Sequence, residues 1–166
     1  MRKIDTVIFD LGGVLVDWNP DYVYRTIFND EEKMRAFYRD ICTSEWNEEQ
    51  DAGRTLKEAT DELVARFPHE EPNIRAYYGR WEEMLKGPID GTVEILDELK
   101  NKNYKLYALT NWSAETFPVA LKRFEFLHWF DGRLVSGEEK IRKPFKEIYE
   151  LIVNRFNIDP TSAVYI

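Results

Sequence analysis

Three polar segments of the sequence carry residue types that can act together on an anion. In chain order these residues are Asp10 with Gly12 and Gly13, Thr110 with Asn111, and Lys143. A glycine pair lets backbone N–H groups approach an oxyanion closely. A carboxylate, a hydroxyl, an amide and a cation complete the set, so the residue types indicate a polar, oxyanion-binding site if the segments meet in space.

The segments lie near short apolar runs that are typical of buried strands. These runs are Thr6–Phe9, Lys105–Thr110, Arg133–Ser136 and Ala163–Ile166. Continuous apolar runs suit strands that are buried on both faces of a parallel sheet. Helical patterns separate the later runs, which is typical of βαβ units. We therefore predict an α/β fold with a Rossmann-like parallel sheet, whose ligands bind at the carboxyl ends of the strands.

Two of the expected helices carry apolar residues on one face. The first has Val93, Leu96 and Leu99, and the second has Phe145, Ile148 and Ile152. Both patterns have helical spacing, so we expect these helices to cover the sheet.

The stretch from about Trp18 to Lys86 interrupts this alternation with helices and no convincing strand. Thr55 and Glu58 match a capping box that opens a helix, which Pro68 closes. Shorter helices are expected over 21–28 and 31–40, and another over the stripe 74–85 that ends at Gly87-Pro88. We predict a core of residues 1–16 and 88–166 and an inserted helical cap of residues 17–87.

Composition limits the classes of partner. The 166 residues include 31 acidic and 23 basic side chains, for a net charge of −8, which argues against nucleic acid or an anionic membrane as the main partner. The hydrophobic fraction of 43% excludes a disordered chain. Cys42 is the single cysteine, and no apolar stretch approaches the roughly 20 residues of a membrane helix. We expect a cytoplasmic protein.

The motifs resemble those of the haloacid dehalogenase superfamily. Residues 9–15 (FDLGGVL), 109–111 (LTN) and 142–144 (RKP) are similar to three of the four signatures of that family, in the same order. The helical insertion lies where that family carries its helical cap. The FDLG form is similar to a branch of sugar-phosphate phosphatases and to the N-terminal domain of certain epoxide hydrolases.

This resemblance implies roles for individual residues. Asp10 would be the nucleophile that forms an aspartyl-phosphate, or an aspartyl ester in a dehalogenase. Thr110 would bind oxygens of the transferring group, and Lys143 would neutralise charge. In the phosphatase branch Mg²⁺ would be held by Asp10 and the carbonyl of Gly12. The remaining candidates for substrate binding are Gly13, Asn111, Trp112 and Trp46, although packing in the core is an alternative for both tryptophans.

Two positions depart from the family pattern. Most phosphatases of the superfamily have an acid two residues after the nucleophile, where this chain has Gly12. General acid help is worth about 10²–10⁴-fold for a poor leaving group, whereas a halide leaves without a proton. Asp17 or the cap residue Glu45 is a hypothetical substitute. The family also expects a pair of acids after the run that ends at Ile166, so we interpret the chain as a fragment.

Three functions are compatible with these features. The favoured one is a Mg²⁺-dependent phosphatase that hydrolyses a small phosphate monoester, for example of a sugar, through Asp10. The first alternative is a 2-haloacid dehalogenase that uses an Asp10 ester without metal. The second is a binding protein that keeps the fold without catalysis. The partner in the first two cases is a small molecule, and the oligomeric state is not encoded in any feature of the sequence.

Overall fold

The computed structural model describes residues 3–166, and its centre is a four-stranded parallel sheet. Residues 1 and 2, which the sequence assigns to the core, lie outside the described residues. In spatial order the strands are β5 (Gly132–Val135), β4 (Lys105–Thr110), β1 (Thr6–Phe9) and β6 (Ala163–Tyr165). Each neighbouring pair is parallel. The predicted α/β fold with a Rossmann-like parallel sheet is confirmed.

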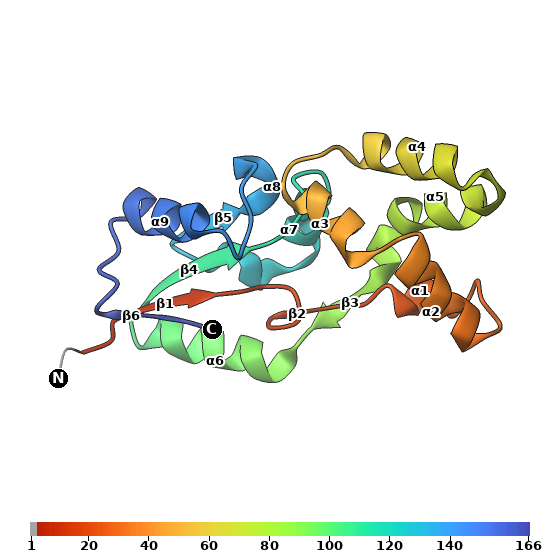
Figure 1. The fold of residues 1–166 in the computed structure, drawn as a ribbon. Coiled ribbons are helices and arrows are strands. Elements are labelled where there is room, and N and C mark those ends of the chain that lie inside the picture. Colours follow the sequence, from red (N-terminus) through yellow and green to blue (C-terminus); the bar gives the residue numbers. More distant parts are fainter. Residues whose placement is uncertain (1–2) are drawn as a thin grey trace.

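Helices cover both faces of this sheet, which explains the continuous apolar runs. In β1, Val7 and Phe9 pack into one apolar cluster, together with Leu96 of α6 (Asp90–Asn101). Ile8 points to the other face and packs with Ile148 of α9 (Lys146–Arg155). Figure 1 shows α6 and α9 on opposite sides of the sheet. Since successive side chains of a strand alternate between faces, burial on both faces requires an unbroken apolar run.

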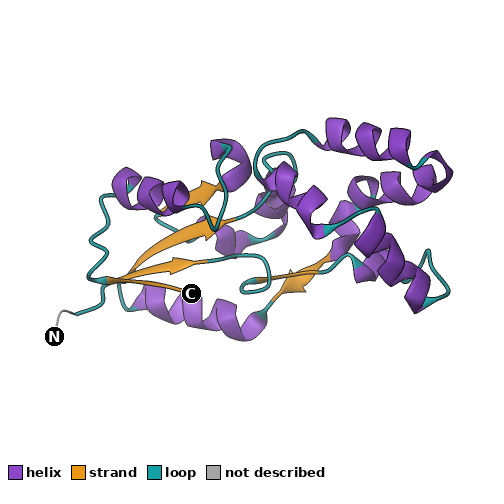
Figure 2. Cartoon of the chain, in the orientation of Figure 1, coloured by secondary structure: helices purple, strands orange, loops and turns teal. Residues whose placement is uncertain are grey.

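A second, two-stranded sheet marks where the chain leaves the core and returns. β2 (Val16–Trp18) pairs antiparallel with β3 (Leu85–Pro88). The expectation of no strand between Trp18 and Lys86 was therefore wrong. The residues of β3, Leu85-Lys86-Gly87-Pro88, have little strand propensity. They become a strand because the departing and returning segments lie side by side, as Figure 2 shows.

The residues between β2 and β3 form the predicted helical insertion. Its helices are α1 (Asp21–Tyr24), α2 (Glu31–Asp40), α3 (Ser44–Asp51), α4 (Leu56–Arg66) and α5 (Glu71–Gly79), with short 3₁₀ turns at Pro68–Glu70 and Trp81–Met84. The predicted capping box at Thr55 and Glu58 is confirmed. Residues 25–28 lie outside α1, contrary to the expected helix over 21–28. The assignment of 17–87 as a separate cap domain stays a prediction.

Aromatic packing holds the insertion together. The ring of Tyr24 is fully buried and lies 5.1 Å from Phe37 and 5.3 Å from Tyr38. Its hydroxyl donates a 2.8 Å hydrogen bond to the backbone oxygen of Asn73 at the start of α5. This apolar cluster continues without a break into the sheet core. The insertion is therefore packed onto the core.

Two further helices and a short turn complete the described part of the chain. They are α7 (Phe117–Arg123), α8 (Ser136–Glu139) and a 3₁₀ turn at Glu125–His128. Phe145 was expected on the buried face of the last helix but is 55% exposed. It is the residue before α9, whose periodicity begins at Lys146, so it does not share the face of Ile148. None of the described helices combines the length and apolar content that crossing a bilayer requires.

Gly137 is required by a close backbone contact. A Cβ atom there would lie 2.4 Å from the backbone nitrogen of Ala114 and 2.7 Å from the backbone oxygen of Trp112. We expect Gly137→Ala to lower the free energy of unfolding by about 1–3 kcal/mol, the usual cost of overpacking. Urea denaturation of both proteins measures this difference.

Gly91→Ala is the matched control, because its Cβ atom would meet nothing within 4 Å and Gly91 lies in α6. The free energy of unfolding should rise by up to about 1 kcal/mol, since Ala favours the helix. Equal stability of Gly137→Ala and the unaltered protein would contradict the packing interpretation.

Candidate active site

The structure brings Asp10 and Lys143 together at the carboxyl end of the sheet. Asp10 follows the last residue of β1, and Lys143 lies in the loop between α8 and α9. The Lys143 Nζ atom is 2.7 Å from Oδ2 of Asp10. The other carboxylate oxygen, Oδ1, accepts a 2.8 Å hydrogen bond from the backbone N–H of Leu11. The ion pair and this hydrogen bond together hold the carboxylate in one orientation. The Asp10 side chain is 31% exposed.

Lys143 has two further partners. Its ammonium group donates to the backbone oxygen of Leu109 at 3.2 Å and to the hydroxyl of Tyr165 at 2.7 Å. Burial, and then the charge of Asp10, raise the pKa of Tyr165 well above its usual value. The phenol therefore stays neutral, and the cation is directed at Asp10. No signal in the sequence distinguished Tyr165, since an aromatic residue in a predicted strand indicates packing only.

Asn111 positions the loop that carries Lys143. Its Oδ1 atom accepts a 2.8 Å hydrogen bond from the backbone N–H of Lys143, and its Nδ2 donates to the backbone oxygen of Lys143 at 3.0 Å. The side-chain amide of Asn111 thus takes the place of a backbone hydrogen-bond partner for Lys143. Asn111 also lines the neighbouring cavity, but these hydrogen bonds make it chiefly a positioning residue.

Thr110 lies at the end of β4, beside β1. Its side chain is buried, and its hydroxyl has no hydrogen-bond partner among the described residues. A buried hydroxyl without a partner costs about 1–3 kcal/mol, which a bound oxyanion next to Asp10 would offset. Gly13 adopts the left-handed conformation with φ of 75°. Its N–H donates to Val16, so it shapes the loop and is not free to bind a substrate.

A cavity of about 80 Å³ lies between this end of the sheet and the insertion. Gly12, Asn111 and Ser113 line it from the core. Asp51 of α3 and Tyr78 of α5 line it from the insertion. Three indoles, those of Trp18, Trp81 and Trp112, complete its walls. Asp10 and Lys143 do not line this mainly aromatic cavity themselves, but Gly12, two residues after Asp10, and Asn111, which holds the backbone of Lys143, do.

The two tryptophans named as candidates occupy different places. Trp112 lines the cavity and donates its indole N–H to Thr116 at 3.1 Å. Trp46 does not line it; its buried indole donates to the backbone oxygen of Ala59 and packs against Tyr77. The position of Trp46 on α3 turns its side chain toward α4 and α5, which gives it a packing role in the insertion.

The acids suggested as substitutes for the missing family acid also lie elsewhere. Asp17 accepts a hydrogen bond from the hydroxyl of Tyr22, and Glu45 is exposed. Neither lines the cavity, whereas Asp51 does. Asp51 ends an acidic segment (EEQD) that is typical of a solvated helix, so no signal in the sequence distinguished it.

The described oxygens provide part of a magnesium site. No group of three or more His, Cys, Asp or Glu side chains within residues 3–166 is arranged to hold a metal ion. Asp10 and the carbonyl of Gly12 remain as candidate protein ligands. Mg²⁺ is commonly bound by one or two carboxylates together with phosphate oxygens and several waters. The donor chemistry of these two residues therefore fits the ion only with substrate or further ligands.

Comparisons with known proteins agree with this arrangement. Residues 4–166 match the family described as haloacid dehalogenase-like hydrolases. The chain is 26% identical to a phosphorylated carbohydrates phosphatase of Thermotoga maritima, over 97% of this chain and 74% of that protein. It is 24% identical to a sesquiterpene phosphatase of Aspergillus oryzae, over 96% of this chain and 78% of that protein.

The fold has a solved counterpart. The crystal structure of a HAD family enzyme of Bacteroides thetaiotaomicron, in complex with magnesium, matches with a TM-score of 0.73 and 20% identity. The match covers 99% of this chain and 83% of that one. Because the family match spans nearly the whole chain, and the sheet places Asp10 beside Lys143, this chain belongs to the haloacid dehalogenase-like hydrolases.

Proposed function

We propose that this hydrolase is a phosphatase that cleaves a small phosphate monoester through an aspartyl-phosphate at Asp10. The observation that carries the proposal is the 2.7 Å pair of Lys143 and Asp10 beside the unpartnered hydroxyl of Thr110. An anion and a cation at the end of β1, with a hydroxyl donor at the end of the neighbouring strand β4, suit a phosphoryl group. Phosphatase relatives that act on phosphorylated carbohydrates and sesquiterpenes support this reaction class.

The residues of the site divide the work of phosphoryl transfer. Asp10 attacks the phosphorus atom, and the bond to the leaving oxygen breaks on the opposite side. Lys143 neutralises charge on Asp10 and on the phosphoryl oxygens, while the hydroxyl of Thr110 donates to one of those oxygens. Asn111 keeps Lys143 in place through its two hydrogen bonds. Water then hydrolyses the aspartyl-phosphate and regenerates Asp10.

Magnesium belongs to this proposal, with Asp10 and the carbonyl of Gly12 as its protein ligands. When bound, the ion lowers the repulsion between the carboxylate and a phosphate dianion. The magnesium complex of the Bacteroides enzyme supports the assignment.

The cavity favours a small leaving group. Its volume of about 80 Å³ and its indole walls suit a compact alcohol, and a sugar ring can stack on such walls. The sugar phosphate, the cytoplasmic location and the lack of a nucleic-acid partner stay predictions.

Loss of the charged pair should abolish turnover. We expect Asp10→Asn to release no phosphate from p-nitrophenyl phosphate, because an amide cannot form the aspartyl-phosphate. Lys143→Met should lower kcat by about 10²–10³-fold, the usual cost of one charge-stabilising donor. Steady-state release of inorganic phosphate measures both.

Lys146→Met is the matched control, since Lys146 is an exposed lysine three residues further on, 82% exposed and paired with Glu150. Its activity should equal that of the unaltered protein. Phosphate release by purified Asp10→Asn at the unaltered rate would contradict the proposal.

Metal dependence separates the proposal from the dehalogenase alternative. We expect a chelator to abolish phosphate release and added Mg²⁺ to restore it, because Asp10 alone repels a phosphate dianion. A 2-haloacid dehalogenase would instead release halide from 2-chloropropionate in the presence of the chelator. Phosphate assay and halide titration on the same sample give the answer, and halide release without phosphate release would establish the alternative.

A further inference from the structure

The loop after β1 lacks a proton donor for the leaving group. Two residues after Asp10, where the family carries an acid, the chain has Gly12. An alkoxide leaves phosphorus slowly unless it is protonated, and general acid help contributes about 10²–10⁴-fold. If the proposed phosphatase acts on an alkyl phosphate, another element must supply this proton.

The direction of attack places the leaving oxygen near the insertion. Attacking and leaving oxygens lie roughly in line across phosphorus. In the proposed reaction Asp10 attacks from the end of the sheet, which directs the leaving oxygen away from the strands, to the side where Gly12 of the core and Asp51 of α3 line the cavity. Among the described residues that line this cavity, Asp51 is the one carboxylic acid.

The surroundings of Asp51 favour a proton at neutral pH. Burial first, and the charge of Glu48 second, raise its pKa to about 7. Arg142, Lys143 and a hydrogen bond from the backbone of Ser113 act in the opposite direction and keep the pKa from rising further. Asp51 is also the last residue of α3, where the negative end of the helix dipole disfavours a second negative charge.

The group facing Asp51 from α5 adds no charge. Tyr78 has its pKa raised above the usual value, chiefly by burial, and Asp51 contributes to that shift. The phenol is therefore neutral throughout the range in which Asp51 titrates. Its hydroxyl is already engaged with Gln50 and Asn47 of α3.

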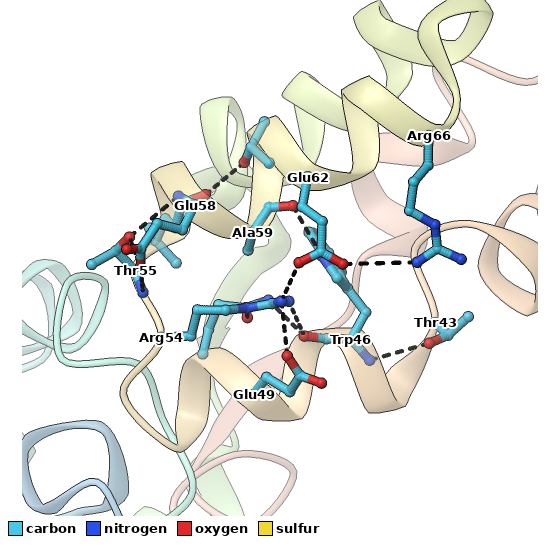
Figure 3. A network of polar contacts seen from close by, with 12 residues as sticks. Thr43, Trp46, Glu49, Arg54, Thr55, Glu58, Ala59, Glu62 and Arg66 are labelled. Atoms are coloured by element: carbon cyan, nitrogen blue, oxygen red, sulfur yellow. Dashed lines mark hydrogen bonds and ion pairs between the residues drawn. The ribbon is translucent and has the colours of Figure 1, made fainter.

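Contacts on both sides hold α3 in this position. From the core, Arg142 forms a 2.9 Å ion pair with Glu48, so the loop that carries Lys143 also holds α3. From the insertion, Arg54 pairs with Glu49 and with Glu62 of α4, both at 2.8 Å. Figure 3 shows Arg54 between these acids. These contacts hold α3, which ends at Asp51, against the loop that carries Lys143.

We propose that Asp51 is the general acid and base of this hydrolase, supplied by the insertion in place of the missing residue after Asp10; this rests on the proposed phosphatase function. As Asp10 bonds to phosphorus, the P–O bond to the leaving group breaks and its electron pair takes the proton of Asp51, releasing the alcohol. The Asp51 carboxylate then removes a proton from water, whose oxygen bonds to phosphorus. The bond to Asp10 breaks, and phosphate, Asp10 and protonated Asp51 result.

Asp51→Asn tests this through the leaving group. For glycerol phosphate, a poor leaving group, kcat/KM should fall by about 10²–10⁴-fold. For 2,4-dinitrophenyl phosphate, whose phenolate leaves without a proton, kcat/KM should change little. With 2,4-dinitrophenyl phosphate the kcat of Asp51→Asn should nevertheless fall and phospho-Asp10 should accumulate, because the variant lacks the base that activates water for the second step. For the unaltered protein, kcat/KM with glycerol phosphate should decrease as the pH rises above about 7, where Asp51 loses its proton. The same pH profile for Asp51→Asn should not show this decrease.

Matched variants separate catalysis from structure. Glu45→Gln, a change at an exposed acid of the same helix that does not line the cavity, should keep both activities, since exposed charges contribute little to stability. Asp51→Ser should show the same dependence on leaving group as Asp51→Asn. Equal loss of kcat/KM with both substrates, or loss with neither, would overturn the role of Asp51. Failure of the unaltered protein with both substrates would instead refute the phosphatase function.

Discussion

The ion pair between Lys143 and Asp10 joins segments that are more than a hundred residues apart in the chain. Its 2.7 Å distance depends on the parallel pairing of β1 with β4, because Asn111, the residue that follows β4, holds the backbone of Lys143. The same loop extends through Arg142 to Glu48 on α3. One set of polar contacts therefore connects the sheet, the loop of Arg142 and Lys143, and the insertion. Its centre is the carboxylate of Asp10 at the end of the buried strand β1.

The position of the insertion follows from the β2–β3 ribbon. This ribbon brings the departing and returning segments together, so the helices between them pack over the carboxyl end of the sheet. Their aromatic interior is continuous with the core. The resulting cavity is small, and three indoles form much of its wall. In a protein with a net charge of −8, Lys143 and Arg142 provide the positive charge that an anionic substrate needs at this point.

The division of labour between core and insertion is the main mechanistic consequence. In the proposed mechanism the core supplies the nucleophile and the cation, and the insertion supplies the half-buried carboxyl group of Asp51, whose pKa is raised to about 7. The partial burial of Asp51 has a consequence for stability. Because folding raises the pKa of this carboxyl group from 3.8 to about 7, the free energy of unfolding falls as the pH rises between these two values, and the full cost remains at higher pH.

The sequence by itself determined the sheet, the insertion and the residues at the sheet edge. Strands buried on both faces need unbroken apolar runs, and the motifs at Asp10, Thr110 and Lys143 follow such runs or lie close to them. Only the tertiary structure decided that Leu85–Pro88 is a strand, that Trp46 packs inside the insertion, and that Asp51 enters the cavity. Each depends on contacts between distant segments. The physical reason is that local periodicity reports which face of an element is apolar, whereas the neighbour that meets a polar side chain is set by packing.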